Sequence, residues 1–511
     1  MKKNIAMIIL ITIFTKGMGF VREIALTYFY GATAVSDVYL IAQTIPSTLF
    51  ALIGTGLATT FIPIFNRVQK EEGDKSALRF SSNVINLVMV FCTVLVLLVL
   101  LFTPQVVKLF ASGFQGDTLS LAISFTRISV FGIYFTALLY ILNAYLQLKN
   151  EFTIPALVSL PMNLVLILFY GAASKFGDVL LAYGIFFSIL IQFLFILPSV
   201  IKNRFRYRAV LERKNVYVRD LLILALPVVL GTSVNQLNVL VDKNIASSIV
   251  EGGISALNYA DRLSGLVYGL FVIPVVTVIY PSISRMAVDR NQEGMGRVVN
   301  ESIVAMSLLI LPASVGAMVL ARPIIEFLFM RGEFDTSAAI LTSEALYYYS
   351  FSMLAYGFRD VLTRVFYSNN DSKTPTTNAM IGVLLNIVLN IVLSRFMGIG
   401  GLALATSISA IITACLLAIS LHRKNFALGL KKSMSKIIRI LLASLLMGGI
   451  AHTAHWILIE KTGSTWALLG AIFFAAVFYA GIIWLMKIEE VETMVTMMKS
   501  KWMKLRKAGK K

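Results

Sequence analysis

Long apolar stretches recur from one end of this 511-residue chain to the other, and they constrain its fold more than any other feature. Hydrophobic residues make up 58% of the sequence and charged residues only 14%, whereas a soluble chain carries about 25% charged residues. Because the bilayer core holds no water, each spanning segment must pair its own peptide groups, as a helix does. The alternating strands of membrane barrels, about ten residues each, are absent from the sequence. The chain is therefore predicted to be an all-α polytopic membrane protein with about 14 transmembrane helices.

Basic residues are distributed unevenly between the two sides that these spans define. The predicted spans cover residues 5–30, 36–63, 82–110, 119–148, 153–173, 178–201, 219–248, 254–283, 298–321, 336–368, 376–397, 400–421, 436–459 and 465–487. Lys and Arg collect in alternate loops, most densely in 202–219, 423–436 and the C-terminal tail. Since loops rich in Lys and Arg stay in the cytoplasm, both termini are predicted to be cytoplasmic. The net charge of +19 then reflects topology and anionic headgroups, and no nucleic-acid partner is expected.

An internal repeat divides the chain into two halves. Pro63 and Pro281 each precede an arginine by four residues at the cytoplasmic end of a span, and Pro155 and Pro375 each open a span. Both pairs are about 220 residues apart, which predicts two pseudo-symmetric six-helix lobes with a site between them. The predicted divisions are an N-terminal lobe 1–201, a cytoplasmic amphipathic linker 202–218, a C-terminal lobe 219–422, two further helices in 423–487 and a basic cytoplasmic tail 488–511. The linker either lies along the headgroups or is a plain positive loop.

Ionisable residues inside the spans are informative, since each costs about 2.5–3.5 kcal/mol to insert. The spans of the two lobes contain Lys16, Arg22, Glu23, Asp37, Asp261 and Arg262. Cations in both lobes predict a central cationic cavity that attracts an anion. The carboxylates would limit the positive electrostatic field in that cavity. The alternative is that the charges pair internally and hold helices together, which we favour for Arg127 and Arg359.

A second group of polar residues lies on the eleventh and twelfth spans. Asn386 and Asn390 are one helical turn apart, and Thr406 follows on the next span. Together with Asp242 of the seventh span they supply one carboxylate and neutral oxygens, which suits a hard monovalent cation such as sodium. Membrane Asn and Thr residues also make interhelical hydrogen bonds, and the residues alone leave the two alternatives open. No other cofactor is expected.

Other functions lack their signatures. The chain has no Gly-x-x-x-x-Gly-Lys-Ser/Thr loop for ATP hydrolysis. His452 and His455 are three residues apart without a third ligand nearby, which argues against a metal site. No grouping of nucleophile, base and orienting residue indicates an enzyme. Cys92 and Cys415 lie within apolar runs and are interpreted as small core residues.

Several motifs resemble those of a known family. The first two spans contain Gly-Phe-Val-Arg-Glu at 19–23, Ser-Asp at 36–37 and Phe-Ile-Pro at 61–63. The second half contains Tyr-Ala-Asp-Arg-Leu at 259–263 and Lys-Thr-Pro at 373–375. Together they resemble the MurJ (MviN) lipid II flippases of the multidrug/oligosaccharidyl-lipid/polysaccharide exporter superfamily, over essentially the whole chain. The family usually has Asp where this chain has Glu23, and one branch has Asp in place of Asn390.

The resemblance implies a monomeric flippase in the inner (cytoplasmic) membrane of a bacterium. Its substrate would be lipid II, an undecaprenyl-pyrophosphate-linked glycan that is moved to the outer leaflet for peptidoglycan synthesis. By resemblance, substrate binds at Arg22, Glu23, Asp37 and Arg262, to which we add Lys16 and Asp261 from their charge and position in the spans. By resemblance too, sodium binds at Asp242, Asn386, Asn390 and Thr406, and 423–487 forms a groove for the lipid tail. Two alternatives stay open: a flippase for another polyprenyl-pyrophosphate-linked oligosaccharide, and a cation-coupled drug exporter, against which the basic cavity argues.

Overall fold

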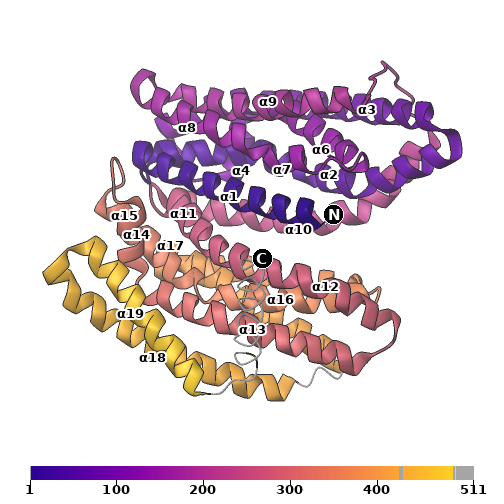
Figure 1. The fold of residues 1–511 in the computed structure, drawn as a ribbon. Coiled ribbons are helices and arrows are strands. Elements are labelled where there is room, and N and C mark those ends of the chain that lie inside the picture. The colour runs from indigo at the N-terminus through magenta and orange to yellow at the C-terminus, as the bar shows by residue number, and fades with distance from the viewer. Residues whose placement is uncertain (1, 425–429, 487–489, 491–511) are drawn as a thin grey trace, which may run out of the picture. The chain divides into compact units, whose positions relative to one another are not determined.

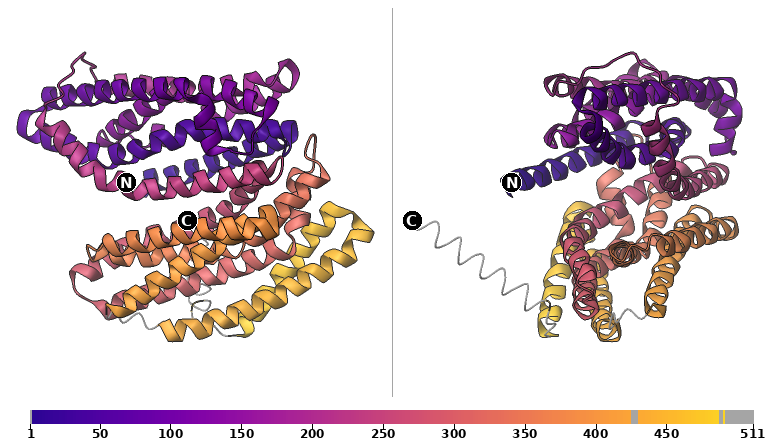
Figure 2. Two further views of the ribbon diagram at one scale, coloured as in Figure 1. Left: turned by 180° about the vertical axis from the view of Figure 1, so that it is seen from behind. Right: turned by 90° about the vertical axis from the view of Figure 1, so that its right-hand side faces the viewer.

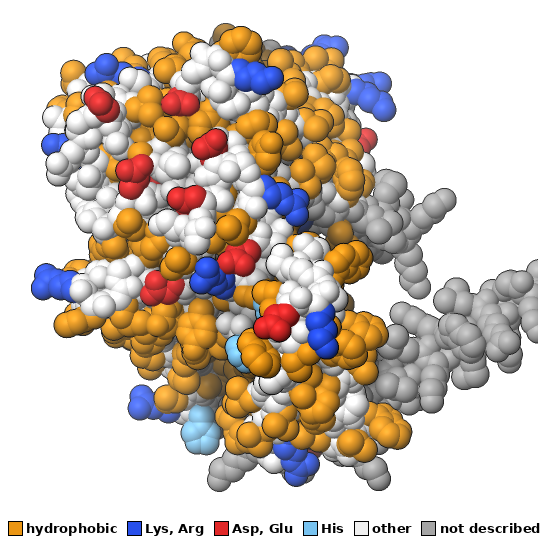
Figure 3. All heavy atoms as spheres, turned by 90° about the vertical axis from the view of Figure 1, so that its left-hand side faces the viewer, with side chains coloured by type: hydrophobic (Ala, Val, Ile, Leu, Met, Phe, Trp, Pro, Cys, Tyr) orange, Lys and Arg blue, Asp and Glu red, His pale blue; other side chains and the backbone are white. Residues whose placement is uncertain are grey.

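The structure of the chain is a computed structural model that describes residues 2–424, 430–486 and 490 (Figure 1). Every regular element of this part of the chain is a helix. Within the described residues, eight helices are long and apolar enough to cross a membrane, or up to eleven if each bent pair counts as one span. Apolar side chains cover much of the surface (Figure 3), including Leu101, which is 72% exposed, and Phe396, which is 82% exposed. The all-α polytopic class is confirmed, and the number of about 14 spans stays a prediction.

The helices pack into two compact units. The first unit comprises Met1–Ala256 and Phe329–Ala338, and within it α1 packs against α8 and α2 against α10. Its helices are α1 (Lys2–Tyr30), α2 (Ala34–Glu72), α3 (Asp74–Leu101), α4 (Thr103–Phe110), α5 (Gly116–Ser129), α6 (Gly132–Leu148), α7 (Thr153–Leu157), α8 (Ser159–Phe176), α9 (Val179–Lys202) and α10 (Val216–Ile249).

The second unit comprises Leu257–Leu328 and the described residues from Ala339 onward. Its last two helices, joined through Gly463, lie side by side in both views (yellow in Figures 1 and 2). Its elements are α11 (Gly253–Val267), which begins in the first unit, the π-helix η1 (Tyr268–Val272), α12 (Ile273–Val288), α13 (Gln292–Val319), α14 (Ala321–Phe329), α15 (Thr336–Tyr349), α16 (Ser352–Ser368), α17 (Lys373–Arg423), α18 (Leu430–Thr462) and α19 (Ser464–Leu485).

Each predicted span falls on one helix or on a run of consecutive helices. The gap predicted between 397 and 400 coincides with a break inside α17 at Gly398, whose backbone has φ 54° and ψ −130°. This left-handed conformation favours glycine, which has no Cβ to clash. The short helices α4 and α14 were not predicted as separate elements. The predicted lobe boundaries stay a prediction, and the predicted tail lies outside the described residues except for Glu490.

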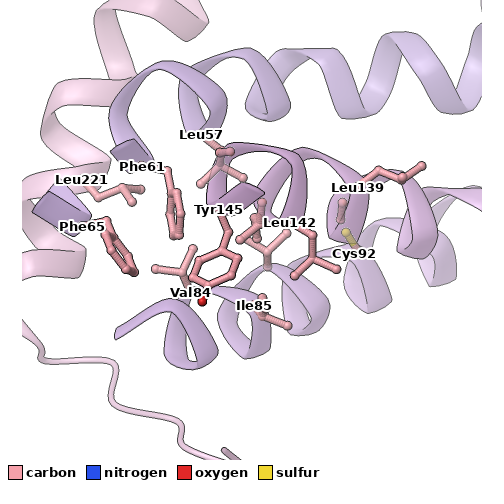
Figure 4. Packing of buried hydrophobic residues seen from close by; sticks show 14 of the residues in the cluster. Leu57, Phe61, Phe65, Val84, Ile85, Cys92, Leu139, Leu142, Tyr145 and Leu221 are labelled. Carbon is pink, nitrogen blue, oxygen red and sulfur yellow. The ribbon is translucent and has the colours of Figure 1, made fainter. Parts of the chain in front are cut away.

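Large apolar and aromatic side chains form the core of the first unit (Figure 4). Phe61 stacks on Phe80 with ring centroids 6.0 Å apart, and Tyr145 packs edge-on against Phe65. Cys92 is buried in this cluster, as predicted. The interpretation of Cys415 as a core residue is wrong, because its side chain is exposed on α17. An apolar run in a membrane helix faces lipid as readily as protein, so composition alone does not distinguish the two.

The segment after α9 is not helical but is fixed to the start of α3 by hydrogen bonds. The amide of Glu212 donates to Asn83 Oδ1 at 2.7 Å, and Asn83 Nδ2 donates to the Glu212 carbonyl at 3.0 Å. The amide of Arg208 donates to Ser82 Oγ at 3.1 Å. Two polar side chains of α3 thus pair with the backbone of the linker, which explains why that backbone needs no secondary structure of its own.

Candidate functional site

A buried charged group lies in the middle of α1. The guanidinium of Arg22 pairs with the carboxylate of Glu23 and donates through Nη1 to Asn163 Oδ1 of α8 at 3.3 Å. The side chains of Arg22 and Glu23 are only 11% and 5% exposed. Because unpaired charges are costly in a low-dielectric interior, this pairing and the amide contact are what allow a cation at this depth.

Two tyrosines extend this group. The hydroxyl groups of Tyr39 on α2 and Tyr170 on α8 share a hydrogen bond of 2.7 Å, and their rings meet edge-on at 5.5 Å. Tyr170 also interacts electrostatically with Arg22 and Glu23. We call Arg22, Glu23, Asn163, Tyr39 and Tyr170 the α1 polar cluster. It holds the guanidinium between partners from three helices, so its position is fixed before any ligand arrives.

Asp37 has a different environment. Its Oδ1 accepts hydrogen bonds from the backbone amide and the hydroxyl of Ser255, at 2.7 and 2.6 Å, and its Oδ2 accepts from the amide of Gly252 at 2.9 Å. Gly252 directly precedes α11 and Ser255 lies in its first turn, where the N–H groups have no partner within the helix. The side chain is 2% exposed. Asp37 therefore caps α11, and its predicted contact with substrate stays a prediction.

The backbone segments around this cap approach each other closely. Gly252 has φ +77°, and a Cβ there would lie 2.0 Å from the carbonyl oxygen of Ala32. The amide of Ala34 donates to Glu251 Oε1 at 3.1 Å. Only glycine fits both the left-handed backbone and the short distance. The loop before α2 and the loop before α11 are thus held together at one end of the first unit.

The remaining predicted substrate residues lie on exposed surfaces. Lys16 is exposed on α1, in the first unit. Asp261 and Arg262 are exposed on α11, in the second unit. The structure therefore brings Arg22 and Glu23 together, whereas a shared site for these and the α11 residues stays a prediction.

Another polar group lies between η1 and α16 of the second unit. The hydroxyl of Tyr268 donates to Asp360, and the guanidinium of Arg359 lies 3.7 Å from the same carboxylate and 4.8 Å from the ring centre of Tyr356. This pairing agrees with the structural role favoured for Arg359 from the sequence. Tyr268 and Asp360 were not predicted. Asp360 could have been found from the sequence, because it is an aspartate adjacent to a membrane arginine.

The predicted polar group on α17 is also present. Asn390 Nδ2 donates to Asn386 Oδ1 at 2.9 Å, and Asn386 Nδ2 donates to Thr406 Oγ1 at 3.3 Å. The asparagine side chains are 2% and 0% exposed. The contact with Thr406 joins the two halves of α17 across Gly398, so the interhelical hydrogen bonds expected as one alternative are confirmed. The amide and hydroxyl oxygens of these side chains are of the kind that binds a hard monovalent cation.

Asp242 lies on α10 of the first unit, whereas Asn386, Asn390 and Thr406 belong to the second. Asn238 Nδ2 donates to Asp242 Oδ2 at 3.2 Å, and the neighbouring Lys243 Nζ donates to Thr44 at 2.7 Å. Among the described residues no group of three or more His, Cys, Asp or Glu side chains is arranged for a metal ion. Sodium coordination by the four predicted residues stays a prediction.

An apolar cavity of about 490 Å³ lies within the second unit. Its wall includes Leu263 of α11, Pro312 of α13, Met447 of α18 and Tyr479 of α19. Tyr479 donates its hydroxyl to the carbonyl of Leu308 at 2.8 Å, which leaves the ring as the surface of the cavity. A cavity of this size and composition accommodates part of an aliphatic chain. It adjoins the two helices from which the sequence predicted a tail groove.

Comparisons with known proteins agree with one another. A family model described as lipid II flippase MurJ matches residues 26–476. A probable lipid II flippase MurJ of Vibrio cholerae is 32% identical, and the match covers 86% of each chain. The lipid II flippase MurJ of Thermosipho africanus is 28% identical over 92% of this chain and 95% of its own.

Solved structures agree on the fold. A lipid II flippase MurJ in an inward closed conformation superposes with a TM-score of 0.82 at 27% identity, covering 94% of this chain and 98% of that chain. An inward-facing multidrug resistance transporter of the MATE family gives a TM-score of 0.68 at 16% identity, covering 81% and 95%. The second likeness concerns the fold alone. The family model and the relatives decide the identity: the chain belongs to the lipid II flippase MurJ family.

Proposed function

We propose that this chain, as a monomer in the cytoplasmic membrane of a bacterium, moves lipid II from the inner to the outer leaflet by alternating access. The observation that supports this most directly is the buried guanidinium of Arg22, fixed by Glu23 and Asn163, in a chain of the lipid II flippase family. An intramembrane cation marks a substrate path by default. Transport by this family involves no chemical conversion, so the chain is a flippase and not an enzyme.

The pyrophosphate of lipid II is the part of the substrate that needs cations. Guanidinium groups bind phosphate oxygens through paired, charge-assisted hydrogen bonds. In this proposal Glu23 neutralises Arg22 between transport events, and the more highly charged pyrophosphate displaces it when substrate enters. Arg262 supplies the second cation from α11, and Lys16, Asp37 and Asp261 border the headgroup.

The polyprenyl tail stays in an apolar environment throughout. The cavity lined by residues of α18 and α19 is suited to isoprenoid units, because its described wall is almost entirely aliphatic. The headgroup crosses while the two halves of the protein rock about it, with both termini on the cytoplasmic side. A bound sodium ion would supply positive charge near Asp242, Asn386, Asn390 and Thr406 and would couple transport to the ion gradient.

The test is complementation of bacterial cells depleted of their own lipid II flippase. Wild-type protein should restore growth and the appearance of lipid II in the outer leaflet, and Arg22→Ala protein expressed at the same level should not. Transport of a different polyprenyl-linked oligosaccharide instead would reassign the headgroup while leaving the flippase mechanism intact, whereas growth without transport of lipid II would contradict the proposal.

A further inference from the structure

A second cavity lies in the first unit, away from the α1 polar cluster. It measures about 390 Å³, within the range of roughly 300–1,000 Å³ typical of ligand pockets. Its wall comes from α3, α6, α9 and the segment after α9, and includes Ile85, Met89, Leu142, Phe193 and Leu197. Ile85 and Leu142 appear close together in Figure 4. The wall is apolar except at one rim, where Asn86 and Tyr207 lie.

That rim is held by hydrogen bonds. The Tyr207 hydroxyl donates to Asn86 Oδ1 at 2.7 Å, and Asn86 Nδ2 donates to the carbonyl of Val210 at 2.8 Å. Phe205 lines the cavity and packs edge-on against Tyr145 at 5.0 Å. The segment after α9 therefore forms one border of the cavity in a fixed position.

The same segment carries a concentration of positive charge. Lys202, Arg204, Arg206 and Arg208 alternate with the lining residues along the chain, and all four side chains are exposed. None of the four makes an ion pair with a described residue. Glu212, the acidic residue of this segment, pairs with Arg79 instead. The segment that borders the apolar cavity thus carries four exposed cations without an ion pair among the described residues.

Exposed apolar side chains lie in the wall of the cavity and next to it along the chain. Ile201 of its wall, at the end of α9, is 63% exposed. Val90, which follows the wall residue Met89 on α3, and Leu194, which follows the wall residue Phe193 on α9, are each 46% exposed. Surfaces of this kind face acyl chains in a membrane protein. A molecule that fits both features has an aliphatic chain for the cavity and an anionic headgroup for the rim.

We propose that this cavity binds an anionic glycerophospholipid of the cytoplasmic leaflet, one acyl chain in the cavity and the phosphate at the basic segment 202–208. Charge complementarity selects an anionic over a zwitterionic headgroup, since each nearby Lys or Arg strengthens binding to anionic lipid. The bound lipid joins α3, α6 and α9 to the segment that leads into α10, which is a position from which membrane composition can influence transport.

The test compares lipid retention by the full-length protein in native mass spectrometry. Dioleoyl phosphatidylglycerol and dioleoyl phosphatidylcholine are offered at equal concentration, so that only the headgroup differs. Wild type should retain phosphatidylglycerol preferentially. Arg206→Ala/Arg208→Ala should weaken that retention by about tenfold or more. The matched control, Arg213→Ala/Lys214→Ala, removes the same charge from exposed residues farther along the segment and should behave as wild type.

Filling the cavity with a larger side chain tests the binding of the acyl chain independently of the headgroup. Met89→Trp and Leu197→Trp, on different helices, should each reduce retention of both lipids, with unfolding temperature measured on lipid-depleted protein as the check on folding. Three results would overturn the proposal. The two double variants could lose retention of phosphatidylglycerol equally, or wild type could show no preference between the headgroups. Alternatively, both tryptophan variants could fold and still retain the lipids as wild type does. Displacement by inorganic phosphate would indicate a bare anion site, and selective retention of a polyprenyl phosphate would indicate a substrate site; either contradicts the assignment.

Discussion

Asp37 on α2 and Ser255 on α11 are joined by two hydrogen bonds, from the serine amide at 2.7 Å and from its hydroxyl at 2.6 Å. The two residues are 218 positions apart in the chain. The same carboxylate accepts the amide of Gly252, so it satisfies the first turn of a helix from outside that helix. Its negative charge also complements the positive end of the helix dipole.

Replacing Asp37 with Ala should therefore lower the stability of the protein before it affects any ligand. The loss leaves buried amides unpaired, which costs about 1–3 kcal/mol. Thermal unfolding in detergent without substrate measures this, with Asp289→Ala, an exposed aspartate at the end of α12, as the control. An unchanged unfolding temperature together with lost transport would instead support a contact between Asp37 and substrate.

Removal of the Arg22 guanidinium should abolish transport. Truncating one partner of a buried charge pair costs about 2–5 kcal/mol, so binding of the pyrophosphate should weaken by more than tenfold. Arg22→Lys should also be impaired because an ammonium group lacks the planar fork. Lipid II appearance in the outer leaflet of depleted cells is the measurement.

A double variant separates the ligand role of Arg22 from its structural role. Arg22→Ala leaves Glu23 as a buried charge without its guanidinium partner, whereas Arg22→Ala/Glu23→Ala removes both charges. The double variant should regain unfolding temperature but not transport. If transport returned with stability, Arg22 would be a packing residue and the substrate assignment would be wrong.

The sequence predicted the positions of most helices, because long apolar runs stand out and membrane helices must pair their own peptide groups. The break at Gly398 and the buried pair Arg22–Glu23 both stand out against apolar surroundings. The sequence could not predict which residues of other helices contact the buried charged side chains. Asn163 is 141 positions from Arg22, and any polar residue in a neighbouring span was an equal candidate. The cap formed by Asp37 depends on a tertiary contact that has no local signature.

The topology implied by the loop charges can be tested by cysteine labelling. Cys92 and Cys415 are first replaced by Ser, since Cys415 is exposed. A cysteine at Lys214, in the basic segment before α10, should react only with cytoplasmic reagent, and one at Asp117, at the start of α5, only with external reagent. Reaction of Lys214→Cys from outside would reverse the orientation.

The loop between α16 and α17 should show acid sensitivity. Burial raises the pKa of Asp371, but hydrogen bonds from Lys424 and Thr374 outweigh it and lower that pKa from 3.8 to about 2. Because the folded carboxyl binds a proton less readily than the unfolded one, its stabilising contribution is present above about pH 4 and is lost as pH falls toward 2. Unfolding temperatures of wild type and Lys424→Met should therefore converge on acidification over this range. Lys373→Met, at an exposed neighbouring lysine, should parallel wild type throughout; if Lys424→Met also did so, the ion pair would be without effect.

Asp242→Asn should remove any response to sodium. Asp242 is the one carboxylate among the four proposed ligands, and the oxygens of Asn386, Asn390 and Thr406 cannot replace its charge. Asn390→Ala should weaken the response without removing it, because it deletes a neutral donor. The measurement is unfolding temperature across a sodium titration, with potassium at equal ionic strength as the control, followed by transport under the same conditions.

The competing explanation is that Asp242 only stabilises packing, through Asn238 and its neighbours on α10. In that case Asp242→Asn would lower the unfolding temperature equally at every sodium concentration, and the slope of the titration would match wild type. Asn238→Ala distinguishes the two, since it removes the amide contact but keeps the carboxylate charge. A wild-type protein without any sodium response would eliminate the site and leave the membrane potential as the driving force for an anionic headgroup moving outward.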